Sequence, residues 1–424
     1  MASSQPKNPF VPSLTSARFI PAIHVVVVHI VLAFHHIAKG TGDDPTNFRP
    51  WCAWGDTLFT GNWIIENLFH SGVITLSFFF TLSGFILTYT YTDRGMPTRV
   101  DKREYFIHRF ARIYPTYALG LLVSIPYFML DIAARKPPYT TFDIIGGGLS
   151  TIFLVQSWVP TWARFWNPPS WSLSCEFFLY LLFPWLVVHL DRYSRRQLWC
   201  VLIGSWICSQ VGPVTYGILD PDGIGRVDWV STAFWLDVVK FNPILRLPEF
   251  VVGIALGKLY RLKTLEEVQA LRGKGTIYSV GAVLIIFTIA LFTLKIPYLM
   301  LHNGLVAPLF AMFIYGLVLG GGPIVWFLNR GWVILCGDAT YALYMIHTSV
   351  IFFAMIFPII DKNRSYSPMT FVIVCTLICI VNSVITFKKF EVPARRRVRR
   401  WFADREDTKK LPAVEELSTG SAAP

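Results

Sequence analysis

The chain is divided into apolar blocks close to twenty residues long, separated by polar connections. Eleven such blocks can be marked, at residues 19–38, 72–91, 112–130, 142–158, 173–190, 198–217, 244–260, 276–294, 303–322, 335–358 and 369–387. A helix of about twenty apolar residues crosses a hydrocarbon core about 30 Å thick. The pattern therefore predicts an all-α integral membrane protein.

Block 142–158 is the weakest candidate for a membrane span. It begins beside Asp143 and carries three consecutive glycines, 146–148, which lower helix stability. If all eleven blocks crossed, the Lys and Arg of residues 94–112 would lie opposite those of 192–196, 258–274 and 388–400, whereas such residues gather on the cytoplasmic side. We therefore predict about ten transmembrane helices, one short re-entrant or interfacial segment at 142–158, and both termini in the cytoplasm.

This pattern predicts three parts of the chain. Residues 1–17 are expected to form a cytoplasmic N-terminal tail, residues 18–393 the membrane domain, and residues 394–424 a basic, partly disordered C-terminal tail. The polar stretches 39–70 and 218–243 are the longest connections between blocks.

Composition supports the membrane interpretation. Of 424 residues, 54% are hydrophobic and 15% are charged, against about 25% charged in soluble domains. Mean hydropathy is +0.49, which excludes a disordered chain or a set of soluble domains. The net charge of +12 comes from Lys and Arg between blocks and in the tail, so we expect no nucleic-acid partner. The seven cysteines form no CxxC pair, and no metal site is expected.

The first block holds an arginine and a histidine on one helix face. Arg18 and His29 are eleven residues apart, which is close to three helical turns and about 16 Å along the axis. His29 would lie near the middle of the membrane, where an imidazole can move a proton near neutral pH. Arg18 would lie at the cytoplasmic interface, where a guanidinium suits a phosphate. A histidine bonded between helices and an arginine reaching the interface would explain the same pair.

Other polar residues also lie inside apolar blocks. A small pair, Ser83 and Gly84, interrupts the second block, and Gly253 and Gly257 in the seventh are spaced for close helix packing. The remaining candidates are two arginines three residues apart at the start of the third block, a carboxylate in the fifth and a histidine near the middle of the tenth: Arg109, Arg112, Glu176 and His347. Each one, taken singly, is also compatible with a structural role.

Taken together, these residues and their neighbours are similar to the sequence motifs of a known family. Arg18 and His29 fit an Arg-x10-His pattern, residues 79–85 a Phe-Phe-x-x-Ser-Gly-Phe element, and residues 109–115 an Arg-x-x-Arg-Ile-x-Pro element. Residues 170–180, 341–347 and 391–393 are similar to three further elements in the same order. The chain thus resembles the acyltransferase 3 family, membrane enzymes that move acyl groups onto sugars and related acceptors. Pro21 and Thr340 depart from the family's usual residues.

The resemblance implies a chemistry for these positions. An acyl-CoA, expected to be acetyl-CoA, would be the donor substrate, with no permanently bound cofactor, and a carbohydrate or lipid-linked hydroxyl would be the acceptor. His29 would deprotonate that hydroxyl or briefly carry the acyl group, with His347 as an alternative base. The donor's phosphates would bind Arg18, Arg109 and Arg112. Ser83 and Gly84 would lie beside the acyl chain, and Glu176 would bind the acceptor or shape the outer vestibule.

The resemblance also bears on location and partners. The plasma or inner membrane is the expected location, with membrane lipids as surroundings. No esterase-like domain follows the last block, so any handoff on the non-cytoplasmic side would need a separate partner. Two other classes stay open at this point. A proton-coupled exporter should show two related halves, which the sequence does not show, and a non-catalytic scaffold should tolerate loss of Arg18 and His29.

Overall fold

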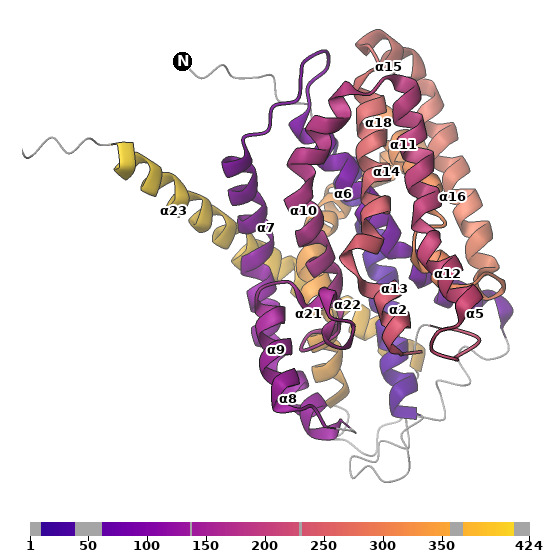
Figure 1. Ribbon diagram of the computed structural model, residues 1–424, viewed down its shortest axis with the longest axis vertical. Coiled ribbons are helices and arrows are strands. Elements are labelled where there is room, and N and C mark those ends of the chain that lie inside the picture. Colours follow the sequence, from indigo (N-terminus) through magenta and orange to yellow (C-terminus); the bar gives the residue numbers. More distant parts are fainter. Residues whose placement is uncertain (1–9, 39–61, 136–137, 229–230, 357–367, 411–424) are drawn as a thin grey trace, which may run out of the picture.

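A computed structural model describes residues 10–38, 62–135, 138–228, 231–356 and 368–410, and these residues fold as helices without a strand. The helices of the first half are α1 Pro12–Ser16, α2 Phe19–Ala38, α5 Trp63–His70, α6 Thr75–Tyr91, α7 Lys102–Val123, α8 Ile125–Ala134, α9 Thr141–Ile152, α10 Trp171–His189, α11 Arg195–Ser209 and α12 Val211–Leu219. Those of the second half are α13 Phe234–Phe241, α14 Pro243–Arg261, α15 Leu265–Leu271, α16 Gly275–Leu291, α17 Tyr298–His302, α18 Ala307–Leu319, α19 Gly322–Leu328, α20 Gly331–Asp338, α21 Thr340–Ile356, α22 Pro368–Thr386 and α23 Val392–Lys410. Most of the long helices run side by side in one bundle (Figure 1).

The expected all-α membrane fold is confirmed, but the count of ten spans is not. Within the described residues, seven helical stretches are long and apolar enough to cross a membrane, or eight if the pair α7 and α8, bent by 51°, counts as one span. α14 falls short because it carries four charged residues, Arg246, Glu249, Lys258 and Arg261. α21 falls short because its apolar stretch, Thr340–Ala354, is brief.

The weak block at 142–158 forms a short element. α9 has 12 residues, which is about 18 Å of helix and too little for a 30 Å core. Asp143 closes a capping box with Thr140 at its start. After it, Leu154 takes a left-handed backbone with φ of 59°, and short 3-10 turns lead to α10. The chain therefore re-enters the bundle at Trp171 rather than crossing once through α9.

Helices α6 and α14 are packed backbone to backbone, an arrangement that glycines permit. A Cβ on Gly84 would overlap the carbonyl oxygen of Phe250, and one on Gly253 would overlap that of Thr81. Gly257 lies against the side chain of Thr88 in the same way. The close packing expected from Gly253 and Gly257 is confirmed, and α6 and α14 form the centre on which the other helices are arranged (Figure 1).

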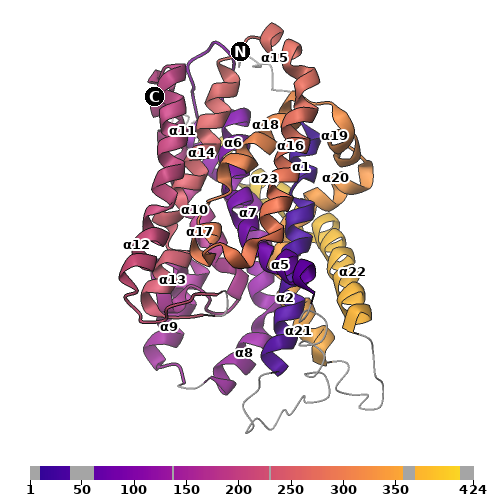
Figure 2. The same cartoon turned by 90° about the vertical axis from the view of Figure 1, so that its right-hand side faces the viewer.

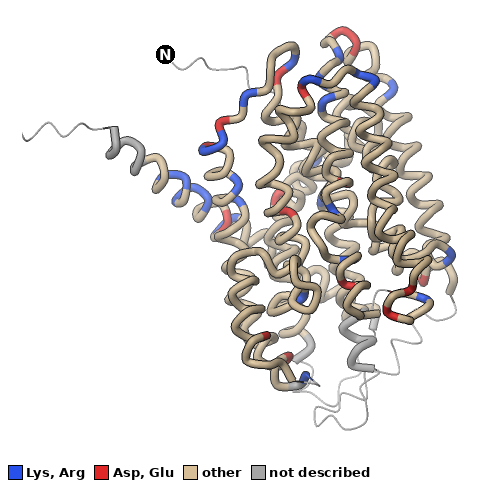
Figure 3. Tube along the Cα trace, viewed as in Figure 1, with Lys and Arg blue, Asp and Glu red and all other residues tan. Residues whose placement is uncertain are grey.

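Three of the four basic clusters meet at one end of the bundle. The Asp191 carboxylate accepts hydrogen bonds from the Thr98 backbone N–H at 2.6 Å and its hydroxyl at 2.8 Å, and pairs with Lys258. Arg94 donates to the Tyr260 carbonyl at 3.2 Å. Figure 3 shows Lys and Arg gathered at this end and along α23. The clusters at 94–112, 192–196 and 258–274 thus share one side, as the charge argument requires.

The N-terminal boundary differs from the expected tail. α1 packs against α20, as Figure 2 shows, and a Cβ on Gly337 would lie 2.6 Å from the Cα atom of Ser16. Ser13, Leu14 and Ser16 are buried. Residues 12–16 therefore belong to the folded bundle, and the stretch Pro12–Val31, which is long and apolar enough to cross a membrane, includes them.

Candidate active site

Two histidines far apart in the sequence meet between α2 and α21. Nδ1 of His29 lies 2.7 Å from Nε2 of His347, and the two rings are parallel with centroids 5.0 Å apart. His347 is fully buried. Apolar side chains of α2, α21 and α22, among them Val26, Ile30 and Leu343, pack in one cluster around this part of the bundle. Within the pair, His347 is thus enclosed by protein, whereas His29 is only partly buried.

The second ring nitrogen of His347 determines which atoms of the pair carry hydrogen. Nδ1 of His347 lies 2.8 Å from the carbonyl oxygen of Tyr344 and 3.2 Å from that of Leu343. Because a carbonyl only accepts, this nitrogen carries the hydrogen, and Nε2 of a neutral His347 ring is an acceptor. His29 must then donate from Nδ1. Its own Nε2 is left with a lone pair, which is the atom that a general base uses.

A cavity with charged walls lies beside this pair. It encloses about 1120 Å³ of space between atoms, part of it open to solvent. Arginines from three parts of the chain line it: Arg18 from the turn between α1 and α2, Arg112 from α7, and Arg395 from α23. Two acids, Glu176 and Asp338, line it as well. The arginines outnumber the acids, so the cavity suits an anionic ligand, part of which contacts apolar side chains of the wall.

The acid Glu176 is held in place by two hydroxyl groups. Ser83 Oγ donates to its carboxylate at 2.9 Å, and the Tyr180 hydroxyl donates to the same oxygen. Ser83 and Tyr180 line the cavity too. Glu176 therefore shares a wall with Arg18 and Arg112. Its role in binding the acceptor or in shaping the outer vestibule stays a prediction.

The cavity and the histidine pair adjoin through an aromatic residue. Tyr344 lines the cavity, and its ring centroid lies 5.8 Å from that of His347. Its hydroxyl is fixed by Ser172 Oγ at 2.8 Å and by the Pro169 carbonyl at 3.1 Å. Neither His29 nor His347 is part of the cavity wall. Tyr344 is thus the side chain that connects the arginine cavity with the imidazoles.

Two predicted site residues lie away from the cavity wall. The guanidinium of Arg109 packs among tyrosine rings, 5.7 Å from the centroid of Tyr180 and 5.8 Å from that of Tyr105. Gly84 faces the backbone of α14, so its Cα contributes helix packing rather than space for a ligand. The structure therefore brings together Arg18, Ser83, Arg112 and Glu176 in the cavity and His29 with His347 beside it.

Two residues of this region are not among the predicted site residues. In the sequence, Arg395 belongs to the basic tail and Tyr344 to one of the family motifs. Arg395 pairs with the buried Glu391 and lines the cavity. Its i, i+4 spacing from Glu391 is a signal that the sequence did contain.

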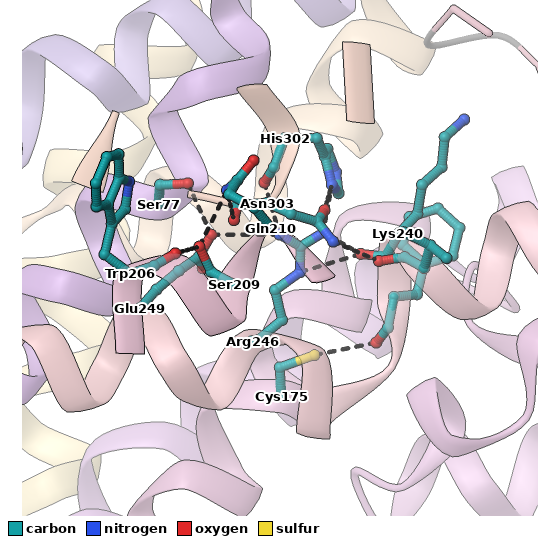
Figure 4. A network of polar contacts seen from close by, with 12 residues as sticks. Ser77, Cys175, Trp206, Ser209, Gln210, Lys240, Arg246, Glu249, His302 and Asn303 are labelled. Atoms are coloured by element: carbon teal, nitrogen blue, oxygen red, sulfur yellow. Dashed lines mark hydrogen bonds and ion pairs between the residues drawn. The ribbon is translucent and has the colours of Figure 1, made fainter. Parts of the chain in front are cut away.

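A second polar centre is completely enclosed in the bundle (Figure 4). Arg246 donates to the His302 carbonyl at 2.6 Å and to the Lys240 carbonyl, and it lies 3.5 Å from Glu249. Ser77 donates to Glu249 at 2.9 Å. Arg246 and Glu249 are fully buried. This network joins α6, α13, α14 and α17, and we assign it a structural role because its two opposite charges, Arg246 and Glu249, are fully buried and lie beside each other.

Among the described residues, no three of His, Cys, Asp and Glu lie close enough together to hold a metal ion.

Comparison with known proteins identifies the class that this fold and site define, a multi-pass membrane acyltransferase. The model of the acyltransferase 3 family, an acyltransferase domain, matches residues 11–388, and the chain belongs to this family. It is 32% identical over 196 residues to acyltransferase MdmB of Streptomyces mycarofaciens, which is 45% of this chain and 47% of that protein. The match thus spans about half the length of that curated relative. No solved structure matches the chain.

The family match decides between the classes that the sequence left open. It supports an acyl-transferring enzyme and not an exporter or a scaffold, and the resemblance drawn from the six motifs is confirmed.

Proposed function

We propose that the protein transfers an acyl group from acyl-CoA to a hydroxyl of a carbohydrate or glycolipid, with His29 as general base. The observation that carries this proposal is the hydrogen-bond chain from Tyr344 through His347 to His29. It leaves one imidazole nitrogen of His29 unprotonated inside an apolar layer, where water does not compete for the proton.

The donor binds through its phosphates in the arginine cavity. Arg18, Arg112 and Arg395 converge there, and guanidinium groups bind phosphate oxygens in pairs. Arg18 precedes His29 by eleven residues, about 16 Å along the helix, so the pantetheine arm extends from the phosphates towards the histidine pair. Arg109 lies behind Tyr180, outside the cavity wall, and supports this site without contacting the phosphates directly. The basic end of the bundle faces the cytoplasm, which supplies acyl-CoA, and both termini are on that side.

The reaction has a simple proton balance. Nε2 of His29 takes the proton of the acceptor hydroxyl, and the oxygen attacks the thioester carbonyl. The new carbon–oxygen bond forms and the carbon–sulfur bond breaks, and the proton held by His29 passes to the departing thiolate. His347 stabilises the imidazolium by accepting the hydrogen bond from Nδ1, in the manner of a carboxylate that orients a catalytic histidine. No bound cofactor or metal takes part in this scheme.

The acidic side of the cavity has a separate task. Glu176 holds Ser83 and Tyr180 at the wall that Arg18 shares. Its charge limits the affinity for the phosphates so that the product CoA leaves, and Ser83 lies beside the pantetheine or acyl chain. The acceptor approaches from the other side of Tyr344. The plasma or inner membrane is the proposed location, and a partner on the non-cytoplasmic side receives or supplies the acceptor.

A labelled-donor assay tests the proposal. Membranes holding the protein are incubated with radiolabelled acetyl-CoA, and label in glycans and glycolipids is measured for wild type, His29→Ala and the control His189→Ala. His189 bonds only at the exposed end of α10, with Tyr193 at 3.2 Å. We expect label transfer by His29→Ala to fall on the order of 10²- to 10⁴-fold, and transfer by the control to stay unchanged. Full activity of His29→Ala would remove its role as base, and no label transfer in wild type would remove the acyl-CoA reaction.

A further inference from the structure

The last helix, α23, leaves the side of the bundle instead of packing along it (Figure 1). It continues from the apolar helix α22 through a π turn at Phe387–Glu391. Its first turn is fixed by the ion pair of Arg395 with the buried Glu391 and by packing along α7. Beyond this turn the helix extends away from the other helices (Figure 1).

The projecting part of α23 has two opposite faces. Ala394, Val398, Trp401 and Phe402 follow the spacing i, i+4, i+7 and i+8, which places them in one apolar stripe. At 100° per residue, the opposite face carries three arginines, Arg396, Arg399 and Arg400. These three are exposed, and Trp401 is 48% exposed. Such a helix, with a basic face and an aromatic residue on the apolar face, has the composition of one that lies on a membrane surface.

We propose that α23 lies in the membrane interface next to α22 and binds the anionic headgroups of phospholipids through Arg396, Arg399 and Arg400. The apolar stripe enters the boundary of the acyl chains, and Trp401 occupies the headgroup layer. Position supports a lipid over other partners, because α23 continues through the π turn from α22, and both belong to the helical stretch Met369–Ala403, which is long and apolar enough to cross a membrane. Charge supports it over a second copy of the chain, since two arginine faces repel each other.

Hydrogen–deuterium exchange of residues 392–403 tests this interaction. The full-length protein is placed, one copy per nanodisc, in phosphatidylcholine alone or with phosphatidylglycerol added. We expect slower exchange in the anionic discs and a smaller difference at high salt, because salt screens exposed charges. Each arginine near an anionic surface contributes about fivefold, so three together give on the order of 100-fold protection.

Two variants with equal charge changes make the test specific. Arg396→Gln, Arg399→Gln and Arg400→Gln together should remove the difference between the two lipids. Arg192→Gln, Arg195→Gln and Arg196→Gln together, in the turn before α11 and at the start of that helix, should leave the difference intact. Trp401→Ser should speed exchange in both lipids. Equal exchange of wild-type α23 in the two discs, or equal loss in the two triple variants, would overturn the proposal. Because the measurement needs no acyl transfer, it stands or falls separately from the reaction proposed above.

Discussion

The hydrogen bond between the two histidines can be tested by removing its acceptor while an aromatic ring is kept in place. His347→Phe keeps an aromatic ring parallel to His29 but deletes the acceptor that lies 2.7 Å from its Nδ1. His29 then has no partner that selects the tautomer with a free Nε2. The imidazolium that forms during proton transfer also loses its acceptor.

The magnitude follows from the kind of hydrogen bond that is lost. A hydrogen bond to a charged group contributes about 1.5–3 kcal/mol, and 1.36 kcal/mol is a factor of ten in rate. We therefore expect kcat to fall on the order of 10- to 100-fold in His347→Phe. This loss is smaller than the 10²- to 10⁴-fold effect expected for removal of a base. KM for acyl-CoA should stay the same, because His347 is not part of the cavity wall.

The assay measures kcat and KM for the donor in wild type, His347→Phe, His347→Gln and His29→Ala. A glutamine carbonyl oxygen can accept from Nδ1 of His29, so His347→Gln should recover part of the lost rate. Unchanged kcat in His347→Phe would refute the orienting role. A loss as large as that of His29→Ala, without recovery in His347→Gln, would instead make His347 the base.

Three further predictions concern packing, the cavity and pH. Gly253→Ala should lower the melting temperature, because its Cβ would overlap the Thr81 carbonyl and overpacking destabilises a protein by about 1–3 kcal/mol. Gly148→Ala, with open space around the added Cβ, should leave the melting temperature unchanged. Equal melting temperatures of the two variants would contradict the close α6–α14 contact. Arg112→Gln should raise KM for acyl-CoA about tenfold or more with little change in kcat, and an unchanged KM would exclude Arg112 from phosphate binding. Burial lowers the pKa of Lys240 to about 8, so the unfolded chain binds more protons between pH 8 and about 10.5, and thermal stability should rise with pH across that window. Lys240→Met should flatten this rise, and an identical pH profile would show that Lys240 does not cause it.

The membrane fold could be read from the sequence because it depends on local properties. Blocks near twenty residues long and the distribution of Lys and Arg predict helices and a basic end, and Gly253 and Gly257 predict close packing. The exact number of spans could not be read in this way. α14 is buried despite four charges because Arg246 and Glu249 find partners on α6 and α17, and such partners are known only once the helices are packed.

The motifs also named most residues of the site, but not their grouping. Arg18, His29, Glu176 and His347 could each be singled out as polar residues in apolar blocks. Only the tertiary structure decided that His29 bonds to a residue 318 positions away, that Glu176 joins the arginines, and that Arg395 of the tail enters the same cavity. The physical reason is that a nearly uniformly apolar helix contains little information about which face it turns to which neighbour. That choice is made by side-chain packing and hydrogen bonds between helices.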